Sequence, residues 1–241
     1  MTRVLIVLPS SSYRVADFVT AAKMLRAETV IATNAAQAMA GDMAYPLVRI
    51  DPRDPEWSAG RIVEFAQRFP LDAVVAADEE GVVMAAVAAR ELGLPHNPPE
   101  AVRVTRDKAA MRQVFADAAL PQPLFRVIGA DDDPVAACSE VGFPCVVKPV
   151  SLSASRGVVR VDGMAEVADT VARIRTIMAK AGRDPGEPIL AESFVSGTEV
   201  ALEGLLVDGH LEVLALFDKP DPMNGPYFEE TILVTPSRLT H

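Results

Sequence analysis

The sequence predicts an α/β protein in two parts, a doubly wound parallel sheet followed by an α+β domain. Short apolar runs alternate with helical segments over residues 2–100, and this alternation implies right-handed βαβ units around a parallel sheet. A Pro-dense stretch, Pro95–Pro99, then marks a boundary, because helices stop before prolines. Beyond it, several strand-like runs accompany only one long helix. The length of 241 residues suits two modest domains, which we expect at 1–100 and 101–241.

Four strands and three helices are expected in the first part. Val4–Leu8 is an uninterrupted apolar run, as in a strand buried on both faces. Val15–Leu25 places apolar residues at helical spacing on one face. In chain order, the expected strands are Val4–Leu8, Val30–Thr33, Leu47–Ile50 and Asp72–Ala77, and the expected helices are Val15–Leu25, Asp54–Phe69 and Gly81–Leu92.

The second part is predicted to be mainly antiparallel. Asp208-Gly209 between two apolar runs is a strong signal for a two-residue hairpin. The expected helices are Thr105–Ala119, Pro134–Val141 and Met164–Lys180. The expected strands are Phe125–Ile128, Cys145–Val150, Val158–Val161, Ile189–Phe194, Glu199–Val207 and Leu211–Phe217.

The composition excludes several function classes. A net charge of −10 and a pI near 4.8 disfavour nucleic-acid binding, which needs clustered Lys and Arg. The longest apolar run, Val82–Ala89, has eight residues, far short of a membrane-spanning helix, and no signal-peptide core is expected near the N-terminus. The cysteines, Cys138 and Cys145, fit a reduced cytoplasmic chain. The three histidines lack metal-ligand spacing, so no zinc site is predicted.

Two familiar phosphate-binding motifs are missing. The loop after the first expected strand, Pro9–Ser12, holds no G-x-G-x-x-G, which a dinucleotide pyrophosphate needs to approach the backbone. No G-x-x-x-x-G-K-[ST] occurs anywhere in the chain. Dinucleotide binding and P-loop chemistry are therefore disfavoured.

A constellation in the second part fits nucleotide binding instead. Lys148 ends an apolar strand, where burial is costly unless an anion pairs with it. The small, hydroxyl-rich loop Ser151–Gly157 can offer N–H groups and hydroxyls to phosphate oxygens. Glu192 and Glu199 flank a glycine break. The backbone at the end of the strand can pair with the edge of an adenine, and Glu199, beyond the turn, can accept hydrogen bonds from ribose hydroxyls. Each feature alone also fits an ordinary surface lysine, a turn or a solvated strand edge.

Taken in order, these residues resemble the ATP-grasp superfamily, in particular its carboxylate–amine ligases. Arg106–Arg112 resembles the helix that carries the family's first ATP-contacting lysine, and Phe143–Pro149 resembles the strand that carries the second. Ser153–Val158 resembles the flexible phosphate-covering loop. Glu192–Glu199 resembles the adenine hinge with the ribose-binding glutamate. The resemblance implies a pre-ATP-grasp domain at 1–100 and an ATP-grasp domain at 101–241, with a small ATP-binding subdomain at about 123–195 and the start of a central antiparallel sheet at about 196–241.

The resemblance also implies roles for single residues. Lys108 and Lys148 would contact the phosphates, Glu192 with the backbone of Ser193 and Val195 would read adenine, and Glu199 would hold the ribose. Lys219 is implied as the catalytic candidate because Lys219-Pro220 and Gly225–Thr231 look like a segment of amino-acid and dipeptide ligases. The full implied set of ATP contacts is Lys108, Lys148, Ser153, Ser155, Arg156, Gly157, Glu192, Ser193, Val195 and Glu199.

One part of the family pattern is missing. These ligases carry an acidic residue and a Glu-x-Asn pair as Mg²⁺ ligands on later strands, and none of Asn34, Asn97 and Asn224 stands in a Glu-x-Asn. We therefore expect the Mg²⁺ ligands in a C-terminal segment absent from this sequence. Catalysis by these residues alone is correspondingly doubtful, because Mg²⁺ neutralises charge during phosphoryl transfer.

The expected function is an ATP-dependent ligase that activates a carboxylate as an acylphosphate for attack by an amine, such as an amino acid. Its expected partners are small molecules, with a homodimer allowed, and its expected cofactors are ATP and Mg²⁺. A non-catalytic nucleotide-binding module or a truncated remnant is the alternative from another class. A purine-biosynthetic or biotin-carboxylase-like ligase is the alternative among enzymes.

Overall fold

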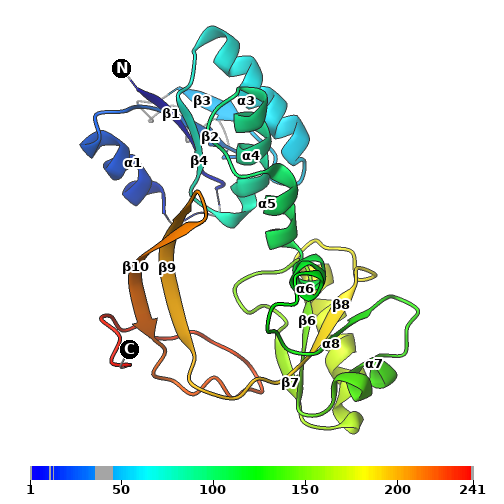
Figure 1. The fold of residues 1–241 in the computed structure, drawn as a ribbon. Coiled ribbons are helices and arrows are strands. Elements are labelled where there is room, and N and C mark those ends of the chain that lie inside the picture. Colours follow the sequence, from blue (N-terminus) through cyan, green and yellow to red (C-terminus); the bar gives the residue numbers. More distant parts are fainter. Residues whose placement is uncertain (1, 11, 13, 36–45, 240–241) are drawn as a thin grey trace. The chain divides into compact units, whose positions relative to one another are not determined.

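The computed structural model describes residues 2–10, 12, 14–35 and 46–239. The chain divides into two compact units, Met1–Arg106 and Asp107–His241 (Figure 1). Each unit has its own sheet and its own hydrophobic core. Among the described residues, no helix combines the length and the apolarity that crossing a membrane requires.

Unit 1 is built on a parallel four-stranded sheet of order β3-β2-β1-β4. All three strand pairs are parallel, which confirms the predicted sheet. The central strands β1 and β2 are the most buried, and their residues are mostly apolar on both faces. Their bounds are β1 Arg3–Val7, β2 Glu28–Thr33, β3 Leu47–Arg49 and β4 Ala73–Ala76.

Helices cover both faces of this sheet. Leu5 and Val7 of β1 point into one cluster, with the helices α3 (Pro55–Arg68) and α4 (Val82–Glu91). Ile6 of β1 points into a second cluster, which includes Ala22 of α1 (Val15–Met24). Side chains alternate between the faces of a strand, so the two clusters show a doubly wound unit.

The segment after the Pro-dense stretch differs from the prediction. The sequence analysis expected one helix over Thr105–Ala119, but α5 (Pro99–Arg106) and α6 (Lys108–Asp117) are separate. Asp107 ends the first and caps the second, since its carboxylate accepts hydrogen bonds from the N–H groups of Ala109 and Ala110. Arg106 of α5 pairs with Glu79, and both residues belong to unit 1, which ends at Arg106. The predicted domains 1–100 and 101–241 stay predictions.

The two expected helices Gly81–Leu92 and Met164–Lys180 become α-helical only from Val82 and Val167. A 3₁₀ turn comes first in both, at Glu79–Gly81 and at Met164–Glu166. Other element ends differ from the prediction by one or two residues, the range over which helix and strand ends fray.

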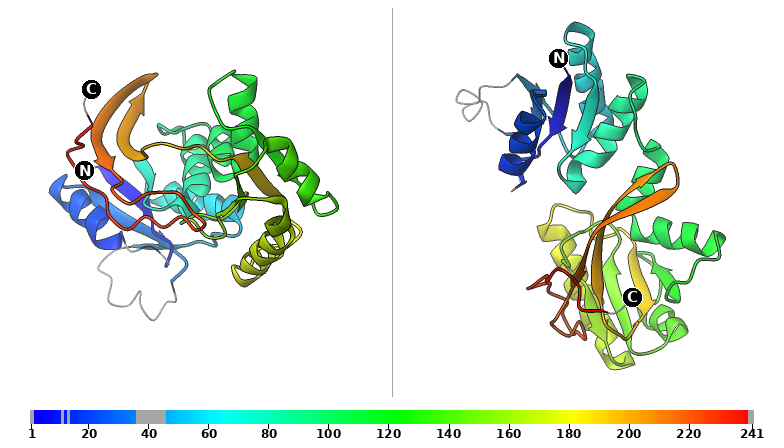
Figure 2. Two further views of the ribbon diagram at one scale, coloured as in Figure 1. Left: turned by 90° about the horizontal axis from the view of Figure 1, so that it is seen from below. Right: turned by 60° about the vertical axis from the view of Figure 1, so that its left-hand side comes forward.

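Unit 2 contains an antiparallel sheet of order β5-β8-β6-β7. The helices α7 (Pro134–Val141) and α8 (Val167–Lys180) pack on one of its faces through a shared apolar cluster (Figures 1 and 2). The strand bounds are β5 Phe125–Ile128, β6 Cys145–Pro149, β7 Val159–Val161 and β8 Ile189–Ser193.

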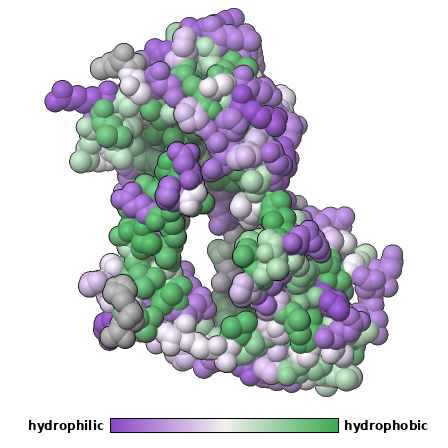
Figure 3. Space-filling view, in the orientation of Figure 1, coloured by the Kyte–Doolittle hydropathy of each residue, from purple (hydrophilic) through white to green (hydrophobic). Residues whose placement is uncertain are grey.

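A two-stranded sheet completes unit 2. It pairs β9 (Val200–Val207) with β10 (His210–Asp218) in the antiparallel hairpin that the sequence predicts. Asp208 and Gly209 have φ of 51° and 79°, the left-handed pair that a two-residue hairpin turn requires. Apolar side chains of the hairpin, such as Leu206, are exposed, and they appear in green along it in Figure 3.

Candidate nucleotide-binding site

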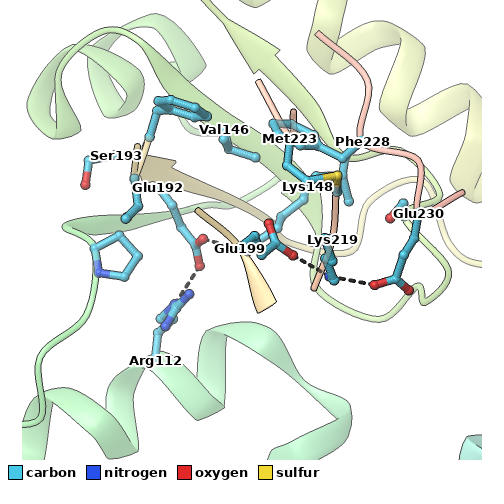
Figure 4. A pocket seen from close by; sticks show the side chains of 15 residues that line it. Arg112, Val146, Lys148, Glu192, Ser193, Glu199, Lys219, Met223, Phe228 and Glu230 are labelled. Atoms are coloured by element: carbon cyan, nitrogen blue, oxygen red, sulfur yellow. Dashed lines mark hydrogen bonds and ion pairs between the residues drawn. The ribbon is translucent and has the colours of Figure 1, made fainter. Parts of the chain in front are cut away.

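Unit 2 contains a cavity of about 480 Å³ (Figure 4). Its wall combines charged side chains with an apolar surface, a mixture typical of sites for small polar ligands with a flat ring. The lining residues are Arg112, Pro123, Val146, Lys148, Ser155, Val158, Glu192, Ser193, Phe194, Val195, Glu199, Lys219, Met223, Phe228 and Glu230.

Strand alternation brings Lys148 and Glu192 to the same face of the sheet. Cys145 and Val147 of β6 point into the core beneath α7 and α8, so Val146 and Lys148 point to the opposite face. Val146 pairs with Glu192 of β8 in the antiparallel register, which makes Lys148 a diagonal neighbour of Glu192, within reach of a long side chain. Lys148 Nζ lies 2.6 Å from Glu192 Oε2.

Arg112 of α6 completes this cluster. Its Nε donates a hydrogen bond of 2.6 Å to Glu192 Oε1. Glu192 is buried, with 5% of its surface exposed, and burial alone would raise the pKa of its carboxyl. The hydrogen bonds and charges of Arg112 and Lys148 outweigh that effect, so the pKa of Glu192 lies below its ordinary value. The Glu192 carboxylate is therefore shared by two basic side chains, and the formal charge of the cluster is +1.

A second charged cluster lies on another side of the cavity. Lys219 Nζ lies 2.5 Å from Glu199 Oε1 and 2.6 Å from Glu230 Oε1 (Figure 4). Partial burial opposes the charge of Lys219, but the two carboxylates outweigh it and raise the pKa of Lys219 above its ordinary value. This cluster therefore holds a charged lysine beside two carboxylates that are about half exposed.

The remaining lining residues supply the apolar surface. Val146 and Val158 come from the sheet and the loop before β7, and Phe194 follows β8 directly. Met223 and Phe228 belong to the segment after β10. An apolar slot beside ionised side chains can accept a planar base at one end and an anionic group at the other.

Seven of the eleven sequence-predicted site residues line the cavity. They are Lys148, Ser155, Glu192, Ser193, Val195, Glu199 and Lys219. Lys108, Ser153, Arg156 and Gly157 are absent from its lining in this structure, so their predicted roles stay predictions.

The structure places Lys108 against the loop that follows β6. Its ammonium donates to the carbonyl oxygens of Leu152, at 2.5 Å, and Val150, at 3.5 Å. Arg156 also folds back onto this loop, with Nε 3.2 Å from the carbonyl of Ser153. Ala154 and Ser155 both have positive φ, 55° and 53°, which is uncommon for residues other than glycine.

The sequence analysis missed five cavity residues that carry charge or a large apolar surface, one of which is Phe194, directly after β8. Arg112 lies one helical turn after Lys108, and this (i, i+4) spacing could have revealed that both share a face of α6. The other three, Met223, Phe228 and Glu230, lie in an irregular segment after β10. No periodic pattern there indicates which side chains turn inward.

The described residues contain no cluster of three or more candidate metal-ligating side chains. The two cavity carboxylates closest to such a role, Glu199 and Glu230, are already bridged by Lys219. His241 lies outside the described residues.

Fold and cavity together define an α/β protein whose antiparallel sheet carries a site of nucleotide-binding character. Residues 141–241 match the family model of the ATP-grasp domain, and residues 19–96 match that of the ATP-grasp N-terminal domain. Both parts of the chain thus match ATP-grasp family models, which confirms the resemblance that the motifs indicate.

Similar proteins include several ligases. Alanine–anticapsin ligase of Bacillus subtilis is 29% identical over 195 residues, which is 74% of this chain and 41% of the relative. A D-alanine–D-alanine ligase of Laribacter hongkongensis is 33% identical over 123 residues, 50% of this chain and 37% of the relative. The crystal structure of an L-amino acid ligase from Bacillus licheniformis matches with a TM-score of 0.80 and 26% identity, covering 100% of this chain and 57% of that one. The chain thus spans about two-fifths of the length of these curated relatives.

Proposed function

We propose that the cavity of unit 2 binds ATP and that the protein is an ATP-dependent ligase, which joins a carboxylate to an amine. The observation that carries the proposal is the pairing of two lysine-containing charge clusters with one apolar slot in a single cavity. This combination matches the three chemical parts of ATP, which are a flat base, a diol and a polyanion.

The lining residues suggest how ATP would lie. The apolar surface of Val146, Phe194 and Phe228 would contact the adenine ring, and backbone groups of Ser193 and Val195 would bind its polar edge. Glu199, about half exposed, would accept hydrogen bonds from the ribose hydroxyls. Lys148 and Lys219 would then face the phosphates as compact cationic donors.

Residues outside the present lining belong to the same proposal. Ser153, Arg156 and Gly157 would close over the phosphates with Ser155. Lys108 would act from α6, and its present contacts with Val150 and Leu152 tie it to the start of that loop. A change in the loop would therefore move Lys108 and Ser155 together.

The proposed reaction has two steps. A carboxylate oxygen takes the γ-phosphoryl group of ATP, which gives an acylphosphate and ADP. The amine nitrogen then attacks the acyl carbon, the bond to phosphate breaks, and the nitrogen loses a proton to give the amide. In the first step, Lys148 and the candidate catalytic residue Lys219 would offset negative charge on the transferring group. Mg²⁺ would neutralise further charge in this reaction, and no step is assigned to it because the described residues contain no cluster of three or more candidate metal-ligating side chains.

The relatives support amino acids as the substrate class. Three similar proteins carry names that describe ligation of amino acids, namely the alanine–anticapsin, D-alanine–D-alanine and L-amino acid ligases. A cytoplasmic location, small-molecule partners and a homodimer form part of the same proposal.

Hydroxylamine trapping tests carboxylate activation directly. The protein expressed from its intact reading frame is incubated with ATP, Mg²⁺, single amino acids and hydroxylamine, and hydroxamate and ADP are measured. Equal amounts of both products are expected, because hydroxylamine replaces the amine in the second step. ATP binding without hydroxamate from any amino acid would favour the alternative of a non-catalytic nucleotide-binding module.

A further inference from the structure

Arg160 of β7 connects two separate parts of the cavity wall without lining the cavity itself. Its guanidinium carbon lies 4.5 Å from the centre of the Phe194 ring, a distance typical of a cation–π contact. The same side chain also contacts the residues after β10. We call residues 223–230 the covering segment, because Met223, Phe228 and Glu230 of this segment line the cavity.

Arg160 holds the covering segment through its backbone. Its NH1 donates to the carbonyl of Asn224 at 2.8 Å, and its main-chain N–H donates to the carbonyl of Pro226 at 2.9 Å. Its Nε donates to Asp162 at 2.7 Å, which fixes the plane of the guanidinium. The three hydrogen bonds use three different donors of Arg160, namely NH1, Nε and the main-chain N–H, so all three can form at the same time.

Close packing leaves little freedom at this point. Gly225 has φ of +84°, and a Cβ there would lie 2.8 Å from Cβ of Arg160. Beyond it, Tyr227 forms a β-bridge with Val159, the residue before Arg160. Arg173 of α8 donates to the Tyr227 hydroxyl at 2.5 Å and lies over its ring at 4.8 Å. The middle of the covering segment is therefore attached to β7 and α8, while both its ends reach the cavity.

We propose that Arg160 is a positioning residue for the nucleotide base: it fixes Phe194 and the covering segment as two apolar walls of one slot. The proposal rests on the proposed function, since it assigns the slot to the adenine of ATP. The side chain of Arg160 contacts Asp162, Asn224 and Phe194, which belong to neither charge cluster of the cavity. Its removal should therefore loosen the slot for the base and leave the phosphate contacts of Lys148 unchanged.

Calorimetric titration with three ligands separates these effects. ATP, adenosine and tripolyphosphate are each titrated into the wild type, Arg160→Met, Arg160→Lys and a control, Arg126→Met. Arg126 lies on β5 and its side chain is 56% exposed, paired with Glu140. Arg160→Met should weaken ATP and adenosine by the same factor, about tenfold, since a cation–π contact and a hydrogen bond together contribute on the order of one power of ten. Tripolyphosphate should lose less affinity than that, because Lys148 lies outside the covering segment and Lys219 is tied to it only through Glu230.

The other variants sharpen the test. Arg160→Lys keeps a cation near Phe194 and should recover part of the affinity for adenosine, and Arg126→Met should bind all three ligands like the wild type. If Arg160→Met fails to fold, Gly225→Ala replaces it in the test, because this substitution displaces the exposed covering segment and keeps Arg160. Gly225→Ala should also lose more affinity for ATP and adenosine than for tripolyphosphate. If Arg160→Met binds ATP as the wild type does, or loses as much affinity for tripolyphosphate as for ATP, the role of Arg160 is overturned and the proposed function is not. A wild type that binds no ATP would overturn the proposed function and this inference with it.

Discussion

Lys148 and Glu192 form a buried ion pair of 2.6 Å between two neighbouring strands, at the wall of the cavity. Arg112 binds the second oxygen of the same carboxylate at 2.6 Å. Two cations thus share one anion, and their attraction to it offsets part of the cost of removing these charges from water. An arriving phosphate can bind the surplus positive charge without leaving Glu192 unpaired, since Arg112 remains.

The Glu192 cluster predicts a specific dependence of stability on pH. The pKa of Glu192 in the folded protein lies below its ordinary value of 4.5. A group with a lowered pKa contributes stability above its unfolded pKa and loses that contribution as the pH falls through its folded pKa. The difference in unfolding free energy between the wild type and Glu192→Gln should therefore shrink as the pH falls from 6 to about 3. Urea unfolding at each pH measures it, and a difference that stays constant or grows would contradict the pairing.

Arg112 should matter for stability as well as for binding. Arg112→Met leaves Glu192 with Lys148 alone, and loss of one charged hydrogen bond at a buried carboxylate should cost about 1–3 kcal/mol. In a double-mutant cycle with Glu192→Gln, the two changes should be strongly non-additive. Additive unfolding free energies would show that the two residues do not interact in solution.

Glu199 should confer preference for a ribose with both hydroxyls. The wild type should bind ATP more tightly than 2′-deoxy-ATP by roughly tenfold, the scale of a hydrogen bond to a charged acceptor. Glu199→Ala should bind both ligands with similar affinity, and calorimetry measures the ratio. Glu203→Ala, which removes an exposed carboxylate from β9, is the matched control and should keep the preference. The same ratio in Glu199→Ala and the wild type would refute the role.

Gly157 should be required by the backbone of the loop after β6. Its φ is +76°, and a Cβ would lie 3.2 Å from Cδ of Pro149. Gly157→Ala should lower the unfolding free energy by about 1–2 kcal/mol, because alanine is strained at positive φ. Gly163→Ala is the control: its φ is −163° and nothing lies within 4 Å of its added Cβ. Equal effects of the two substitutions on thermal or urea unfolding would contradict this conformation.

The sequence predicts most of the fold because its signals are local. The apolar strands of unit 1 and the Asp208-Gly209 turn each determine their own conformation, and the structure confirms the parallel sheet and the hairpin. The break between α5 and α6 was missed because helical periodicity continues across Asp107, whose capping hydrogen bonds depend on side-chain geometry.

Strand patterns and the family resemblance were enough to predict some residues of the candidate site, such as Lys148 and Glu192. Other cavity residues were missed because only tertiary packing brings them to the cavity. Arg112 reaches Glu192 across 80 residues of sequence, and Phe228 reaches the cavity because Arg160 and Arg173 hold the covering segment. Neither relation leaves a periodic signal in the chain.

The most direct test of nucleotide binding is calorimetric titration of ATP into the wild type, Lys148→Ala, Glu199→Ala and the control Lys180→Ala. Lys180 is an exposed residue in the last turn of α8, so its removal tests only the general loss of a positive charge. ATP should bind the wild type and Lys180→Ala equally well, and the affinity should fall at least about tenfold in Lys148→Ala and in Glu199→Ala. Unchanged affinity in both of these variants would contradict the assignment of the cavity to ATP.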